Sequence, residues 1–220
     1  MNKYTLASRL SRIQEELPKL SSTITAMKIT DTELYSKNYE ELSLDAAIRA
    51  ERVACSLRNL IFAANLVERP VLMDLTAEEH GITICHSHDR VEITLPGLMP
   101  KRIKRVNTTF LTEPLYHCLE KYSKEHTLPH FKECVVCFSH VFDRSLPSRR
   151  VRDYDNLECK QILDTAASFL MTDDSGLYCD AYHTTEFGDC DCTILTIMET
   201  SAFPGWLKEL KNKGFTISDF

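Results

Sequence analysis

The chain has 220 residues and a formal net charge of −6, with 43% hydrophobic and 26% charged residues. This length holds one large domain, or a smaller domain with an appendage, and the composition is typical of a soluble globular protein. The acidic charge excludes indiscriminate binding to polyanions, so any contact with nucleic acid must come from a local basic patch.

The sequence disfavours two further classes of protein, those that span a membrane and those that are secreted with a disulfide framework. No apolar run approaches the length of a bilayer span, and the first residues lack the apolar centre of a signal peptide. Nine cysteines without such a signal indicate reduced thiols rather than a disulfide framework. We therefore expect a cytoplasmic protein without membrane contact.

Two cysteine spacings are compatible with zinc, Cys134-x-x-Cys137 and Cys190-x-Cys192. The first pair lies in a run typical of a β-strand, where residues three apart point to opposite faces. Small buried core residues are therefore the expected role of most cysteines.

Residues 1–80 have helical periodicity. Leu6, Leu10, Ile13 and Leu17 recur at helical spacing, and Pro18 is expected to end or bend that helix. A stretch rich in Ser and Thr follows, from Ser21 to about Lys37. Ser43 is the expected N-cap of a second, long helix, with Asp45 in its first turn and its end before Pro70. We interpret this region as an appendage that packs, dimerises or docks a protein partner.

The hydrophobic period changes near Gly81. Alternating residues predict a β-hairpin that turns near His88-Asp89, with Val91, Ile93 and Leu95 in its second strand. His86 and His88 share one face of the first strand, where a half-exposed polar face is the commoner explanation than a metal site. A basic loop follows, which contains Lys101, Arg102, Lys104 and Arg105.

The rest of the chain predicts a small α+β domain. A helix is expected over about 112–126, and a strand over 131–142 is apolar on both faces, which is typical of a central strand. A second basic loop contains Arg149, Arg150 and Arg152. A helix over about 156–170 and strands near 177–185 and 193–198 follow, and Pro204 and Gly214 suit the two ends of a last short helix.

The acidic residues after the second basic loop suggest a metal site. Asp153 and Asp155 alternate across Tyr154, so both carboxylates face one side of an extended backbone. Asp174, with Asp173 beside it, returns after the length of one helix and a turn. Convergent carboxylates repel one another unless a cation such as Mg²⁺ or Mn²⁺ neutralises them, and such an ion supports phosphodiester hydrolysis. For each aspartate alone, a helix cap or a solvated turn is the simpler interpretation.

Two more residues belong to this candidate site. Asn156 is expected to begin the helix, whose N–H groups and dipole favour a nearby phosphate. Lys160 follows on the same helix and could stabilise a phosphate in the transition state. An exposed helical lysine with no such role is the equally weighted alternative.

These motifs resemble the RusA-like Holliday-junction resolvases. The resemblance covers about residues 91–200 and is carried by Ile93-Thr94-Leu95-Pro96, by Asp153-Tyr154-Asp155-Asn156-Leu157 after the arginines, by Asp164, and by Thr172-Asp173-Asp174-Ser175. It implies a small mixed β-sheet with flanking helices, a homodimer, and Mg²⁺-dependent (or Mn²⁺-dependent) cleavage of branched DNA in recombination and repair. Asp153, Asp155 and Asp174 would be the metal-binding acids, with Asp173 adjacent, and Lys160 the helix lysine.

The sequence departs from this family in three ways. The family lysine falls four residues after the second aspartate, where this chain has Cys159, and we expect a π-bulge near residues 158–161 to restore Lys160 to the site. The helical residues 1–80 are absent from the small resolvases, and the net charge is acidic. The alternatives are a catalytically inactive DNA-binding or protein-interaction module, and another metal-dependent phosphoesterase acting on RNA or nucleotides. We expect the domain itself to span 81–220.

Overall fold

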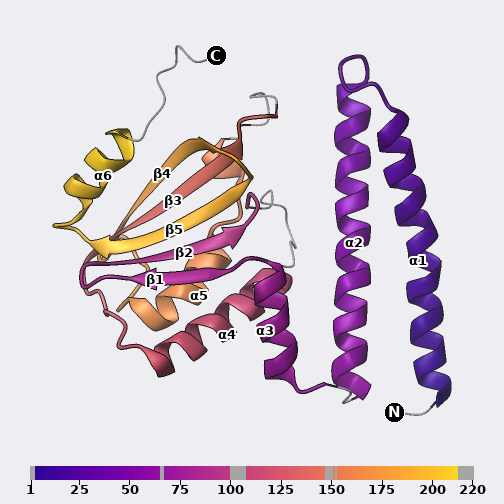
Figure 1. The fold of residues 1–220 in the computed structure, drawn as a ribbon, viewed down its shortest axis with the longest axis horizontal. Helices are drawn as coiled ribbons and strands as arrows, with labels where there is room; N and C mark the ends of the chain where they lie inside the picture. The colour runs from indigo at the N-terminus through magenta and orange to yellow at the C-terminus, as the bar shows by residue number, and fades with distance from the viewer. Residues whose placement is uncertain (1–2, 65–66, 100–107, 147–150, 152, 213–220) are drawn as a thin grey trace. The chain divides into compact units, whose positions relative to one another are not determined.

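The computed structural model describes residues 3–64, 67–99, 108–146, 151 and 153–212. The chain is α+β: a helical hairpin precedes a mixed five-stranded sheet with flanking helices, as the sequence predicts (Figure 1). It divides into two compact units, Met1–Leu72 and Met73–Phe220. Most of helix α3 (Arg69–Glu79) therefore belongs with the sheet, whereas the sequence placed the boundary near residue 80.

Helix α1 (Lys3–Ile29) corrects the expectation at Pro18, because it continues through the proline without a break. A proline inside a helix removes one backbone hydrogen bond, and the packing of α1 on α2 offsets this loss. The Ser- and Thr-rich stretch also begins as helix. Its hydroxyls bond back within the helix, Thr23 to the Lys19 carbonyl at 3.0 Å and Thr25 to the Ser21 carbonyl at 2.9 Å.

Helix α2 (Ser36–Ala64) begins earlier than expected, so the N-cap prediction at Ser43 is wrong. Ser43 lies inside the helix, where its hydroxyl donates to the Tyr39 carbonyl at 2.7 Å. Asp45 accepts hydrogen bonds from Arg49 Nε at 2.7 Å and from Thr23 Oγ1 of α1 at 3.0 Å. Its carboxylate therefore links the two helices instead of capping one.

The sheet of the second unit has the strand order β1-β2-β5-β3-β4. The strands are β1 (Thr83–His86), β2 (Arg90–Pro96), β3 (Cys134–Asp143), β4 (Cys179–Gly188) and β5 (Cys192–Glu199). The β1–β2 hairpin is confirmed, with Ser87 N–H donating to the Arg90 carbonyl at 2.9 Å across its turn. β3 is a central strand, as its apolar sequence predicts, and pairs antiparallel with β5 and parallel with β4.

Helix α5 (Lys160–Leu170) connects the parallel strands β3 and β4, as such a connection requires. With α4 (Thr109–Glu125) it covers one sheet face, where Leu111, Leu115 and Leu119 of α4 are fully buried (Figure 1). The other face carries α6 (Phe203–Asn212) through Trp206. Gly214, the expected C-cap, lies outside the described residues. Among the helices that the structure describes, none is long and apolar enough to cross a membrane.

Candidate functional site

Lys160, the first residue of α5, contacts one acid on the helix itself and one in the turn after it. Its Nζ lies 2.9 Å from Asp164 Oδ1, one turn along the helix, and 3.5 Å from Asp174 Oδ2. The hydrogen bond that Lys160 donates to Asp164 is the largest cause that raises the pKa of Lys160, and the charge of Asp174 adds to it. Lys160 is thus a cation at neutral pH, and it is held beside the second acidic pair.

Residues 154–156 correct the predicted start of this helix. Tyr154–Asn156 form a 3₁₀ turn, η2, in which Asn156 N–H donates to the Asp153 carbonyl at 3.2 Å. The helix begins only at Lys160, so Asn156 does not present a helix N-terminus. Asp153, Asp155 and Asn156 are all exposed.

The predicted π-bulge near residues 158–161 is wrong. α5 is a regular α-helix from its first residue, and the extra residue of this chain is accommodated before it, between η2 and Lys160. Cys159 takes the N-cap position with α-helical backbone angles. Lys160 still reaches Asp174, because its side chain is long enough to make this contact from the first helical position.

The two aspartates of the second pair have different partners. Asp173 Oδ1 accepts the Ser175 N–H at 2.7 Å, and the hydrogen bonds from Ser175 lower the pKa of Asp173. This arrangement orders the turn itself. Asp174 is the member that contacts Lys160, and it is the half-buried one of the two.

The expected set of three acids is not gathered around one point. Within the described part of the chain, one group of three His, Cys, Asp or Glu side chains has all its ligand atoms within 4.8 Å of one another, and it is His140, Cys159 and His183. Asp153, Asp155 and Asp174 form no such group.

The histidine–cysteine cluster lies between the sheet and the start of α5. His140 comes from β3, His183 from β4, and Cys159 from the N-cap of α5. His140 Nε2 and His183 Nδ1 are 3.2 Å apart. The Tyr154 ring of η2 stacks on both imidazoles, at centroid distances of 5.5 Å and 5.2 Å, and its hydroxyl lies 3.0 Å from Thr185 Oγ1.

Sequence reasoning missed this cluster because its members are far apart in the chain. One signal was present: His140 stands in a strand whose other residues are almost all apolar, and a polar side chain buried there needs a partner. A second signal was Cys159, which stands where the RusA-like resolvases have their helix lysine. What could not be seen was the register that places His183 opposite Phe138, one pleat from His140.

The zinc spacings considered from sequence do not form sites. Cys134 packs in the core cluster beneath α4 and α5, and Cys137 in the cluster beneath α6, so they lie on opposite sheet faces as expected. Burial raises the pKa of each thiol to about 12, as for small core residues. Cys190 is exposed and Cys192 half-buried, and no metal-binding group described in the structure includes them.

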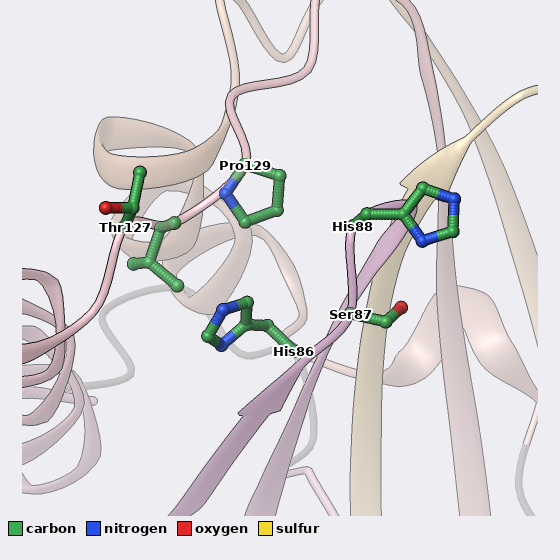
Figure 2. Close-up of a pocket in the computed structure, with 6 residues that line it drawn as sticks. His86, Ser87, His88, Thr127 and Pro129 are labelled. Carbon is green, nitrogen blue, oxygen red and sulfur yellow. The ribbon is translucent and has the colours of Figure 1, made fainter.

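The expectation that His86 and His88 share one strand face is wrong, because β1 ends at His86 and His88 lies in the turn beyond it, although both line one hollow. Figure 2 shows that His86 points toward the segment of Thr127 and Pro129, whereas His88 points away from it. His86 Nδ1 lies 3.0 Å from the Tyr122 hydroxyl, and a hollow of about 400 Å³ lies beside it. No acidic residue lines this hollow.

The predicted nucleic-acid contacts other than Asn156 lie outside the described residues. These are Lys101, Arg102, Lys104, Arg105, Arg149, Arg150 and Arg152.

The profile of a family of unknown function (DUF6100) matches residues 2–220, and the chain belongs to this family. No curated protein matches the sequence significantly.

Proposed function

We propose that the chain is a Mg²⁺-dependent endonuclease that hydrolyses phosphodiesters in branched DNA and acts as a homodimer. One observation supports this most: Lys160 contacts Asp174, so the helix lysine and the closing acid of the motif that resembles the RusA-like resolvases lie side by side. The sheet order also supports it, since the motif follows the central strand β3 and returns beside it through α5.

The donor chemistry fits Mg²⁺, although the three acids are separate in this structure. Asp153 and Asp155 are exposed, Asp174 is half-buried, and all three offer hard oxygen ligands. Mg²⁺ is usually held by one or two carboxylates, with water and substrate phosphate completing its shell. Bound there, it would polarise a phosphodiester oxygen and lower the pKa of an attacking water.

Lys160 has the role of a charge partner for the scissile phosphate. Its raised pKa excludes it as a general base at neutral pH, because the amine keeps its proton. With a phosphate in place, its N–H groups can turn from Asp174 to an equatorial oxygen and stabilise developing negative charge. Asp174 would then be free to hold the metal ion.

The segment before α5, which contains Asn156, is suited to hold DNA rather than a small molecule. Asn156 is exposed and can donate to a phosphate, and the basic loops flank this segment in the sequence. A nucleotide phosphoesterase would need an enclosed pocket at the acids. The exposure of Asp153 and Asp155 favours a large, open substrate.

A second candidate is a catalytically inactive DNA-binding or protein-interaction module. The separation of the three carboxylates supports it, because a preorganised metal site would bring them within ligand distance of one another. In that case Asp164 and Asp174 only neutralise Lys160 and order the turn.

The experiment that tests the proposal is cleavage of a synthetic four-way DNA junction and a linear duplex of the same sequence, with Mg²⁺, Mn²⁺ or a chelator. Asp155→Asn is the test variant, because it keeps the size of the side chain and removes its charge. Asp189→Asn is the matched control, since its carboxylate is 96% exposed and lies after β4.

We expect junction-selective, metal-dependent cleavage by the wild type and by Asp189→Asn, and a loss of at least about 100-fold with Asp155→Asn. Junction binding without any cleavage would favour the inactive module. Cleavage of RNA or nucleotides alone would favour the other phosphoesterase.

A further inference from the structure

The cluster of His140, Cys159 and His183 has the chemistry of a metal site of a kind different from the aspartates. Imidazole nitrogen and thiolate sulfur are the ligands that Zn²⁺ takes in proteins, whereas Mg²⁺ takes oxygen. The three ligand atoms lie within 4.8 Å of one another. They come from three separate elements, so their convergence is a property of the fold and not of a local sequence repeat.

The spacing of the two imidazoles suits a shared ion. His140 Nε2 and His183 Nδ1 are 3.2 Å apart. Two nitrogens that each lie about 2.0–2.1 Å from one zinc are separated by about 3.3 Å in a tetrahedron. In the absence of a cation the same contact is a hydrogen bond in which one neutral imidazole donates to the other.

That hydrogen bond leaves His140 incompletely satisfied. Its Nδ1 is buried and has no hydrogen-bond partner among the described residues. His140 is 1% exposed, so water does not compensate freely. Nδ1 lies across the ring from Nε2, so an ion shared with His183 would not contact it, and the assignment rests on the three convergent ligand atoms.

The aromatic surroundings hold both rings in place. The planes of the two imidazoles are nearly parallel, with an interplanar angle of 10°, and Phe138 stacks on His183 at 5.4 Å while Tyr154 stacks on both. Ligands fixed by packing lose little freedom when a cation binds.

We propose that His140, Cys159 and His183 bind a Zn²⁺-class cation, with the fourth coordination position open to water. Three protein ligands and one open position are the pattern of accessible zinc sites, whereas closed structural sites use four protein ligands. The ion would tie the start of α5 to β3 and β4, and through the Tyr154 stack it would also fix η2, which follows Asp153 and contains Asp155. This inference does not depend on the nuclease activity.

The protonation of the free site favours the histidine ligand and opposes the thiolate ligand. Burial, and secondarily His183, lowers the pKa of His140 to about 4, so the imidazole is neutral and offers a lone pair. Burial, and secondarily Glu158, raises the pKa of the Cys159 thiol to about 12. A bound cation supplies the positive charge that the thiolate needs, and the thiol proton leaves to solvent.

The test is zinc binding by the full-length chain after metal removal, measured by calorimetry and by competition with a chelating dye. Co²⁺ serves as the spectroscopic probe, because a thiolate ligand produces a charge-transfer band that imidazoles do not. Cys159→Ser and His183→Gln are the test variants. Cys85→Ser and His88→Gln are the controls, since both residues are exposed and lie outside the cluster.

We expect one Zn²⁺ per chain, and affinity at least about 100-fold weaker in either test variant, because loss of an outer-shell partner alone costs about 10–100-fold. The Co²⁺ charge-transfer band should disappear in Cys159→Ser. Far-ultraviolet circular dichroism of the metal-free variants establishes that they are folded.

Three results would overturn the proposal. They are no binding to the folded wild type, unchanged affinity in both test variants, and a charge-transfer band that survives Cys159→Ser.

Discussion

The helical hairpin and the α+β unit bury their apolar side chains to very different degrees. In the α+β unit the strands, α4 and α5 share one core cluster, with Leu115, Ile162 and Leu195 at 0% exposure. In the hairpin the buried apolar residues that the structure describes are Ile13, Ala46 and Leu60. The α+β unit thus carries a core of its own, and the hairpin does not.

Instead of a core, the hairpin has an exposed apolar stripe along α1. Leu10, Leu17 and Ile24 recur every seven residues along α1 and are exposed by 40%, 47% and 53%. A stripe with a seven-residue period is typical of helices that pack against a further helix. We therefore expect the α+β unit to fold on its own contacts, and the hairpin to gain stability by association in the proposed homodimer.

The two units should differ most in how much stability they lose when a buried side chain is shortened. Leu195→Ala removes a fully buried side chain from the centre of the sheet and should lower the free energy of unfolding by about 2–5 kcal/mol. Leu60→Ala in α2 should cost less, about 1–2 kcal/mol, because the sides of a two-helix hairpin can relax around the gap. Urea unfolding is followed by the fluorescence of Trp206, the single tryptophan, for the α+β unit and by far-ultraviolet circular dichroism for the helical hairpin. Equal losses in the two variants would contradict the comparison.

Gly188→Ala should show how tightly the α+β unit is packed. A Cβ at Gly188 would lie 2.7 Å from Val141 Cγ1, so a strand must shift, at a cost of about 1–3 kcal/mol. Gly176→Ala is the matched control, because nothing lies within 4 Å of its added Cβ. Thermal melts of the two variants that coincide would show that the end of β4 is looser than the structure indicates.

The smallest change in the stability of the fold is expected when negative charges are introduced on the apolar stripe of α1. Leu17→Glu combined with Ile24→Glu replaces two exposed side chains and should leave the unfolding of the α+β unit unchanged. Self-association should weaken at least about tenfold, because like charges would face one another in a pair of hairpins. Analytical ultracentrifugation measures this. Leu177→Glu, at an 87% exposed position after the acidic turn, is the control. An unchanged oligomeric state would place the dimer contact elsewhere.

The elements that the sequence predicted best are those whose pattern depends on burial. The apolar run of β3 indicated a strand covered on both faces, and the alternation in β2 indicated a hairpin, because a sheet sorts side chains by face. The helix boundaries were less predictable. Pro18 and Ser43 carry strong local signals, but the pairing of α1 with α2 overrides both.

The sequence predicted one contact of the candidate site and missed the other cluster. The contact of Lys160 with Asp174 agrees with the motif that the sequence shows. The partnership of His140, Cys159 and His183 depends on the β3–β4 register and on a helix start three residues after Leu157, and neither can be read from spacing. The departure at Cys159 was visible, but its place beside two histidines was not.

The central claim is that Lys160 is part of a working phosphodiesterase site and not only a surface ion pair. The most direct measurement is the single-turnover rate of four-way-junction cleavage by Lys160→Met beside the wild type, with junction affinity measured in parallel. The account predicts a loss of at least about 100-fold in the cleavage rate, with affinity changed only a few-fold, since one phosphate contact among many is removed. Cleavage by Lys160→Met at the same rate as the wild type would contradict it.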